Sequence, residues 1–123
     1  LQMNPTQEGR ESSLLRGVES VPGLGLNSEG VVAVGPDTKV LARGNRGTIE
    51  AIQVGKNRYG VQRHTEETYS LIRRLLAEET QFQRFGIPPS DVLSDYEAVR
   101  KAYDAVARRL VTNILGAANL LPD

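Results

Sequence analysis

Residues 94–113 read SDYEAVRKAYDAVARRLVTN, and this stretch predicts a helix that packs against another part of a protein. Its larger apolar residues recur at alternating spacings of three and four, which places them on one helical face: Tyr96, Val99, Tyr103, Val106 and Leu110. Ser94 is followed three residues later by Glu97, a spacing typical of a capping box. We therefore expect the helix to begin at Ser94. The apolar spacing continues through Asn113 to Leu120, so a coiled-coil seam is an alternative to an ordinary core helix, which we favour.

A second helix is expected just before this one, over residues 65–85. Thr65 suits the N-cap position, and an apolar face follows at helical spacing, made of Tyr69, Leu71, Ile72, Leu75, Leu76, Phe82 and Phe85. Gly86 and the pair Pro88-Pro89 then end the helix. Because the connection is short, the two helices are predicted to form an antiparallel hairpin within residues 64–123.

The middle of the chain, residues 31–63, has the composition of a small sheet. Four short stretches rich in Val and Ile, at 31–34, 39–42, 48–54 and 58–61, are separated by turn sequences such as GPDT, GNRG and GKN. Short connections make neighbouring strands antiparallel, so we expect a meander of three or four strands. A sheet this small is marginal alone and must pack on the helices or on a partner.

The first thirty residues are predicted to form a flexible or extended N-terminal arm, because they contain many Gly and Pro residues and little continuous apolar sequence. A mobile tail is the simpler interpretation. The alternative is an arm that orders along a neighbouring subunit through the apolar residues Leu14, Leu15, Val18, Val21, Leu24 and Leu26. The fold class expected for the whole chain is therefore α+β: an arm, a small antiparallel sheet and a C-terminal helical hairpin.

The composition limits the possible functions. The chain has 123 residues, no net charge and no cysteine, which excludes disulfides and thiolate metal sites. Its mean hydropathy is −0.34, and no apolar run approaches the roughly 18 to 20 residues of a membrane span. We expect a soluble protein without a membrane partner, cytoplasmic or associated with a virus particle.

Basic residues concentrate in one part of the chain. Residues 35–63 carry six Lys and Arg against Asp37 and Glu50, whereas the flanking segments are each acidic. Two turns supply most of these cations, and they form a candidate contact for nucleic acid or phosphate made of Arg43, Arg46, Lys56, Arg58 and Tyr59.

No catalytic motif is recognisable in the sequence. His64 is the only histidine and has no second histidine or cysteine with which to hold a metal. Glu79 lies at the edge of an apolar helix face, where an ion pair with Arg108 or Arg109 is the expected explanation. We therefore expect neither an enzyme nor a cofactor.

The leading hypothesis from the sequence is a non-enzymatic assembly or adaptor subunit that binds other proteins, with a virus or phage particle as one setting. The residues predicted to form its protein interface are Leu14 and Leu15 on the arm and Tyr96, Val99, Tyr103, Val106 and Leu110 on the helix. A basic module that binds nucleic acid is the alternative, and an enzyme of unknown type comes third.

Overall fold

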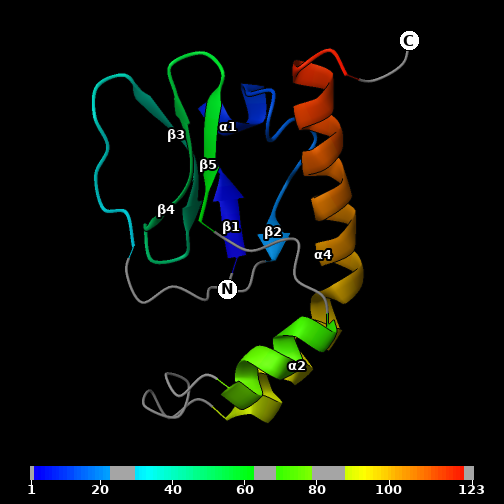
Figure 1. Ribbon diagram of the computed structural model, residues 1–123. Coiled ribbons are helices and arrows are strands. Elements are labelled where there is room, and N and C mark those ends of the chain that lie inside the picture. Colours follow the sequence, from blue (N-terminus) through cyan, green and yellow to red (C-terminus); the bar gives the residue numbers. More distant parts are fainter. Residues whose placement is uncertain (1, 23–29, 63–68, 79–87, 121–123) are drawn as a thin grey trace.

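The computed structural model describes residues 2–22, 30–62, 69–78 and 88–120, and it has the predicted α+β fold (Figure 1). The described elements follow the order β1 (Gln2–Pro5), α1 (Gln7–Glu11), β2 (Val21–Pro22), β3 (Thr38–Gly44), β4 (Ile49–Val54), β5 (Arg58–Val61), α2 (Tyr69–Glu78) and α4 (Pro89–Ala117). A curled antiparallel sheet forms one layer, and α4 runs along one side of it and continues beyond it to meet α2.

The sheet has five strands in the order β2-β1-β3-β4-β5, all antiparallel. The strands predicted at 39–42, 48–54 and 58–61 are confirmed as β3, β4 and β5. The strand predicted at 31–34 is wrong, since this segment makes only an isolated bridge from Val31 to Ile49. The reason is that β5 already pairs with β4 from Ala51 onward, so only the start of β4 has an edge left for Val31.

The prediction of an extended N-terminal arm is wrong for residues 2–22, because they form part of the folded domain. β1 pairs with β3, and β2 pairs with β1, so this segment completes one side of the sheet. Met3, Leu14, Leu15 and Val18 are buried in the same cluster as Leu41, Ala42, Ala51 and Leu110. Residues 2–22 have too little apolar sequence to fold alone. They become ordered because the edge of β3 pairs with β1 and the apolar face of the sheet packs against their buried side chains. Leu24 and Leu26 lie outside the described residues.

A tight contact between α1 and β3 holds the N-terminal segment in place. The Thr6 hydroxyl caps α1 by accepting a hydrogen bond from the Gly9 N–H at 3.0 Å, and it donates to the Val40 carbonyl at 2.7 Å. The Thr6 N–H donates to the Leu41 carbonyl at 2.8 Å. Gly9 lies so close to β3 that a Cβ there would overlap the Leu41 carbonyl oxygen. No larger residue fits at this position without a shift of the backbone.

The long helix α4 begins at Pro89, earlier than expected, and the capping box predicted at Ser94 is wrong. Pro88 occupies the N-cap position and Pro89 the first turn, where its missing N–H leaves no unsatisfied donor. Ser94 and Glu97 therefore lie inside the helix. The helix ends in a Schellman motif, in which Asn119 has a φ of 55° and the Leu120 N–H donates to the Leu115 carbonyl at 2.8 Å.

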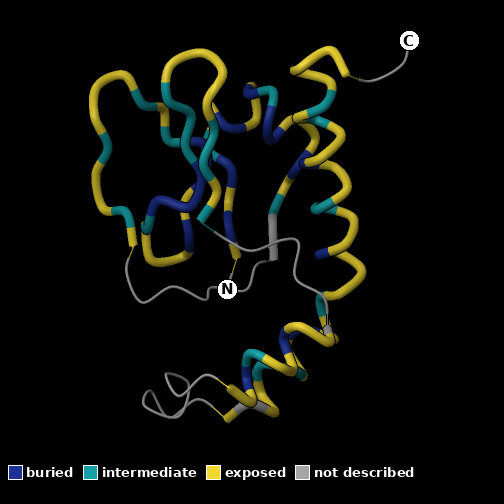
Figure 2. The backbone as a smooth tube through the Cα atoms, in the orientation of Figure 1, coloured by how far each residue is buried: buried dark blue, intermediate teal, exposed yellow. Residues whose placement is uncertain are grey.

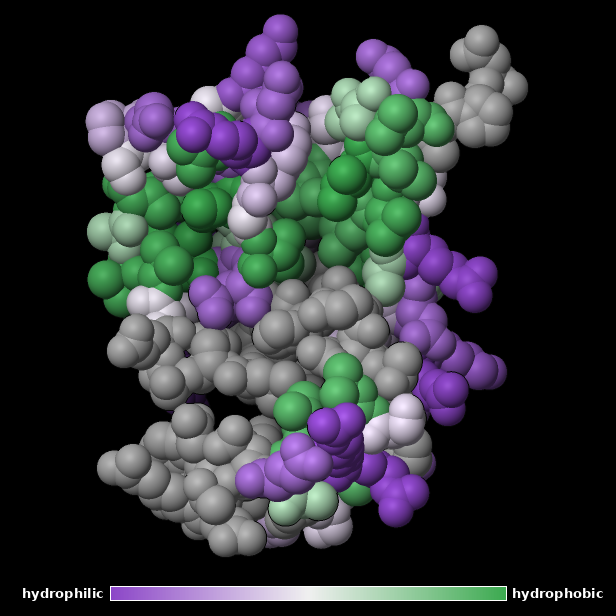
Figure 3. Space-filling model, in the orientation of Figure 1, coloured by the Kyte–Doolittle hydropathy of each residue, from purple (hydrophilic) through white to green (hydrophobic). Residues whose placement is uncertain are grey.

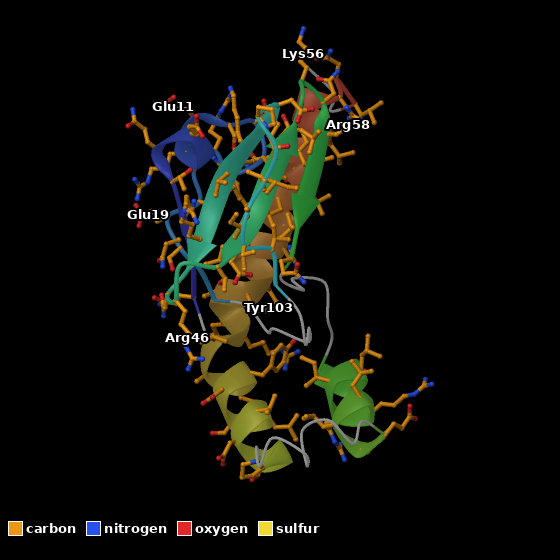
Figure 4. All side chains as sticks on the ribbon, turned by 90° about the vertical axis from the view of Figure 1, so that its left-hand side faces the viewer. Glu11, Glu19, Arg46, Lys56, Arg58 and Tyr103 are labelled. Atoms are coloured by element: carbon orange, nitrogen blue, oxygen red, sulfur yellow. The ribbon has the colours of Figure 1, made fainter. Side chains whose placement is uncertain are left out.

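The predicted helical hairpin is present, since α2 packs against the N-terminal half of α4 in the opposite direction (Figures 1 and 4). Ile72 and Leu76 from α2 are buried against Tyr96 and Tyr103 from α4. The two rings are 5.5 Å apart in an edge-to-face arrangement. Residues 65–68 and 79–85 of the predicted first helix, with His64 and Glu79, lie outside the described residues.

The C-terminal half of α4 packs on the sheet side of the molecule rather than on α2. Val106 and Leu110 contact the cluster formed by the sheet and the N-terminal segment. The Asn113 amide donates to the carbonyls of Leu14 and Arg16 at 2.7 and 3.0 Å, and the Arg109 Nε donates to the Arg16 carbonyl at 3.1 Å. Asn113 therefore fixes a contact between the N-terminal segment and α4, rather than a position in the coiled-coil seam that was the alternative to a core helix.

Candidate interaction surface

Most of the residues predicted to form a protein interface are buried inside this chain. Leu14, Leu15, Tyr96, Tyr103 and Leu110 are all at most 5% exposed, and Val99 and Val106 are half-buried. Figure 2 shows the buried positions of α4 on the side that faces the rest of the molecule. The interface predicted at these five residues is therefore corrected, because all five are buried within one chain; for Tyr96, Tyr103 and Leu110 the helical spacing reports that burial.

Different apolar residues of α4 remain in solvent near its C-terminal end. Val111 is 56% exposed and Ile114 is 49% exposed, although neither side chain is small. They are three residues apart, so they lie within about 60° of each other around the helix axis. Leu120, just beyond the helix, is 69% exposed. Figure 3 shows a continuous hydrophobic area over this part of α4.

Strand β5 forms one open edge of the sheet, and its residue Tyr59 lines the same groove as Ile114 of α4. The Gln62 N–H donates to the Glu50 carbonyl at 2.8 Å, which fixes the hydrogen-bonding phase between β4 and β5. Since hydrogen-bonded and non-hydrogen-bonded pairs alternate, the backbone groups of Tyr59 and Val61 point away from β4, toward the open edge. No strand described in the chain pairs with that edge. It thus presents an unused row of donors and acceptors.

A small apolar hollow of about 150 Å³ adjoins the same strand. Val31, Ile49, Ile52 and Val61 form most of its apolar lining, with the backbone of Gly60. Val61 itself is 38% exposed. We use the name open face for the β5 edge together with the exposed apolar residues Val61, Val111 and Ile114.

A larger groove of about 800 Å³ opens at the end of the sheet where β4 turns into β5. Its walls come from α1, from this turn and from the end of α4. Carboxylates of Glu8 and Glu11 and ammonium groups of Lys39 and Lys56 share the groove with Ile114 and Tyr59. Charges of both signs line it, so its electrostatics favour neither an anionic nor a cationic ligand.

The basic residues predicted to act together are separated by the fold. Arg43 and Arg46 lie at the β3–β4 turn, whereas Lys56 and Arg58 lie at the β4–β5 turn, and Figure 4 shows Arg46 at the opposite end of the sheet from Lys56 and Arg58. Successive hairpin turns of a meander fall at alternate ends, which is why these cations do not converge. Arg43 also donates to the Gly47 carbonyl at 3.0 Å.

Tyr59, the aromatic residue of that predicted contact, packs against the main apolar cluster and is only half-buried. Its ring is therefore not a free stacking platform of the kind used for unpaired bases. The geometry weakens the nucleic-acid alternative.

The sequence analysis missed the open face and one buried carboxylate. Glu50 is 4% exposed and accepts a hydrogen bond from the Thr48 hydroxyl at 2.6 Å, in the space left by the missing side chain of Gly44. Val111 and Ile114 could have been found as apolar residues that fall outside the Tyr96–Leu110 stripe. No local pattern marks β5 as an edge, because that depends on the order of the strands.

Two further properties concern the described residues. Among them, no group of three or more His, Cys, Asp or Glu side chains is placed to hold a metal ion. None of the helices found in the described ranges is long and apolar enough to cross a membrane.

Neither a scan against protein-family models nor a search of curated proteins finds a match to this chain. The functional proposals therefore depend on the geometry of the open face.

Proposed function

We propose that this chain is a non-enzymatic assembly or adaptor subunit that binds protein through its open face. The observation that carries the proposal is the combination of an unpaired edge strand, β5, with exposed apolar side chains on that strand and on α4, namely Val61, Val111 and Ile114. Tyr59 of β5 and Ile114 of α4 also line one groove. Single exposed apolar residues are ordinary on protein surfaces, but neighbouring ones beside a free strand edge are typical of binding sites.

The two parts of the open face supply different contributions to binding. Backbone groups at the β5 edge give directional hydrogen bonds to an added strand, and apolar side chains on α4 give contact area that water leaves on binding. A partner that covers both parts gains affinity from each. The interface residues of this proposal are thus Val61, Val111 and Ile114, in place of the buried residues predicted from the sequence.

The proposal is tested by placing a photo-crosslinking amino acid at Val111 in the full chain, expressed in the cells that naturally make it. We expect a discrete crosslinked species that contains one defined partner. The matched control carries the same amino acid at Ala102, which is exposed and lies nine residues away, on the opposite side of α4. Equal, weak crosslinking at Val111 and Ala102 would overturn the proposal.

A further inference from the structure

We propose that the partner at the β5 edge is a second copy of this chain, paired antiparallel through β5 about a two-fold axis that passes beside Gly60. The inference rests on the proposed function and names the partner of the same surface. The two sheets would join into one, with five strands from each copy. A two-fold axis perpendicular to a sheet preserves its faces, so both α4 helices would lie on one side of the joined sheet.

The backbone of β5 fits this register. Tyr59 and Val61 direct their N–H and C=O groups toward the open edge, and they are two residues apart around Gly60. Antiparallel pairing centred on Gly60 places Tyr59 opposite the partner's Val61, and Val61 opposite the partner's Tyr59. Each of these pairs exchanges two backbone hydrogen bonds, so the register uses about four of them. All four outward groups of each β5 strand are then satisfied.

The side chains of β5 are also complementary to themselves in this register. Tyr59 faces the partner's Val61, which is a favourable aromatic and β-branched pair across antiparallel strands. Arg58 faces the partner's Gln62, so no like charges meet directly. Gly60 lies at the axis, at a non-hydrogen-bonded pair where the two strands approach most closely, and it has no side chain to separate them.

The β5 edge lacks two of the features with which monomeric proteins block strand pairing, proline and a bulge, although it is only four residues long and carries the charge of Arg58. Residues 58–62 contain no Pro and no Lys, and the register between β4 and β5 continues without a bulge. The self-complementary register favours a second copy over an unrelated extended peptide, which has no reason to match Arg58, Tyr59 and Val61 in order.

The first test is disulfide trapping with Gly60→Cys. The chain contains no cysteine, so a disulfide in this variant joins two copies. Non-hydrogen-bonded antiparallel pairs have Cα atoms about 4.5 Å apart, within the range that a disulfide spans. The new Cβ would lie 3.2 Å from Cγ1 of Ile52, which requires a small adjustment of that side chain. The control is Val32→Cys, at a position that is 88% exposed.

We expect Gly60→Cys to form a covalent dimer under mild oxidation at a rate about tenfold or more above that of Val32→Cys. Equal rates for the two variants would overturn the register. A circular dichroism spectrum identical to that of the unmodified chain verifies that Gly60→Cys is folded. Should Ile52 prevent folding, the pair Arg58→Cys with Gln62→Cys, each expressed separately and then mixed, tests the same register at the flanking positions.

The second test is the molar mass of the purified chain by light scattering across a wide concentration range. We expect twice the 13.4 kDa of one chain, and a return to 13.4 kDa in Val61→Lys, whose lysine interrupts the edge yet can reach solvent. The control Val32→Lys should remain dimeric. We expect the dissociation constant of Val61→Lys to rise about tenfold or more.

The outcomes separate this inference from the proposed function. A monomer at every concentration, or a dimer that Val61→Lys leaves intact, would overturn pairing through β5. If Val111 still crosslinks to a different protein in cells, the assembly function stands and the partner is that protein. If neither association nor crosslinking occurs, both proposals fail.

Discussion

The two halves of α4 bury the same apolar face against different parts of the chain. The N-terminal half packs on α2 through a cluster of four buried side chains, Ile72, Leu76, Tyr96 and Tyr103. The C-terminal half packs on the sheet and on residues 14–18, where a larger buried cluster includes Met3, Leu15 and Leu110. A single helical stripe thus serves two separate cores.

Long-range hydrogen bonds add to the packing of the C-terminal half of α4 and the sheet. Around the sheet, Thr6, Asn113 and Arg109 add hydrogen bonds between segments far apart in the sequence. Between α2 and α4, Ile72 and Leu76 pack against Tyr96 and Tyr103. The ion pair between Arg74 and Glu78 lies within α2. We therefore expect the sheet end to be the more stable unit and the hairpin end to open first, since the buried cluster described at the sheet end is the larger one and local stability follows the number of buried contacts.

The largest expected effect comes from Tyr103→Ala, which removes the most voluminous fully buried side chain and its contact with Tyr96. We expect a loss of about 3–5 kcal/mol in the free energy of unfolding. Hydrogen exchange should show that α2 loses protection while β3 and β4 keep theirs. Uniform loss over both ends would show instead that α4 joins them into one cooperative unit. Ala102→Ser, at an exposed position of α4, is the control.

Gly9→Ala tests the sheet end, again by comparing stability and hydrogen-exchange protection at the two ends of the molecule. Its methyl group would overlap the Leu41 carbonyl, so we expect a loss of about 2–4 kcal/mol, measured by urea unfolding. Here protection should fall in β1 and β3 rather than in α2 alone. Gly30→Ala has open space around its new Cβ and should change stability by less than about 0.5 kcal/mol. Similar effects of the two alanines would contradict the close approach of α1 and β3.

Asn113→Ala examines the link between the N-terminal segment and α4. Two carbonyls, those of Leu14 and Arg16, lose their amide donor, and we expect a cost of about 1–3 kcal/mol. Thermal unfolding gives the measurement. The neighbouring Thr112→Ala changes an exposed side chain and should be neutral or slightly stabilising, since Ala favours helix. If Asn113→Ala left the thermal stability unchanged, water would replace the amide as donor and the link would add no stability.

The smallest effect is expected at the surface of α2, from Arg74→Gln. The Arg74 Nε lies 3.1 Å from Glu78 Oε1, but both side chains are largely exposed. We expect a loss of about 0.3–0.5 kcal/mol at low salt that vanishes at high salt. Arg73→Gln, which is also exposed, serves as the control. If the loss of stability in Arg74→Gln persisted at high salt, Arg74 would have a role beyond this ion pair. The stability of the hairpin end would then depend less on packing than we infer.

Much of the fold could be predicted from the sequence wherever local rules apply. Strands β3, β4 and β5 were expected because β-branched runs alternate with turns, and Gly47 and Gly55 adopt the positive φ angles that such turns require. The body of α2 and the course of α4 were expected from apolar spacing. The start of α4 was missed because Ser94 offered a good cap while Pro88-Pro89 was interpreted only as an end of the preceding helix.

The candidate site was much less predictable. Tyr96, Tyr103 and Leu110 were correctly identified as residues of a buried face, but their spacing does not say whether the cover comes from the same chain or another. Arg43 and Lys56 were grouped because they are near in sequence, yet they belong to turns at opposite ends of the sheet. Val61 carries no local signature of exposure, whereas Val111 could have been identified because it falls outside the apolar stripe of α4.

The sequence by itself determined which residues form helices and strands, and which faces of those elements are apolar. Those properties follow from backbone sterics, turn chemistry and the fixed periods of 3.6 and 2 residues. Only the tertiary structure decided that residues 2–22 join the sheet, that α4 is divided between two cores, and that β5 is left with an open edge. The hydrophobic effect is not directional, so it requires an apolar face to be covered without specifying which segment covers it.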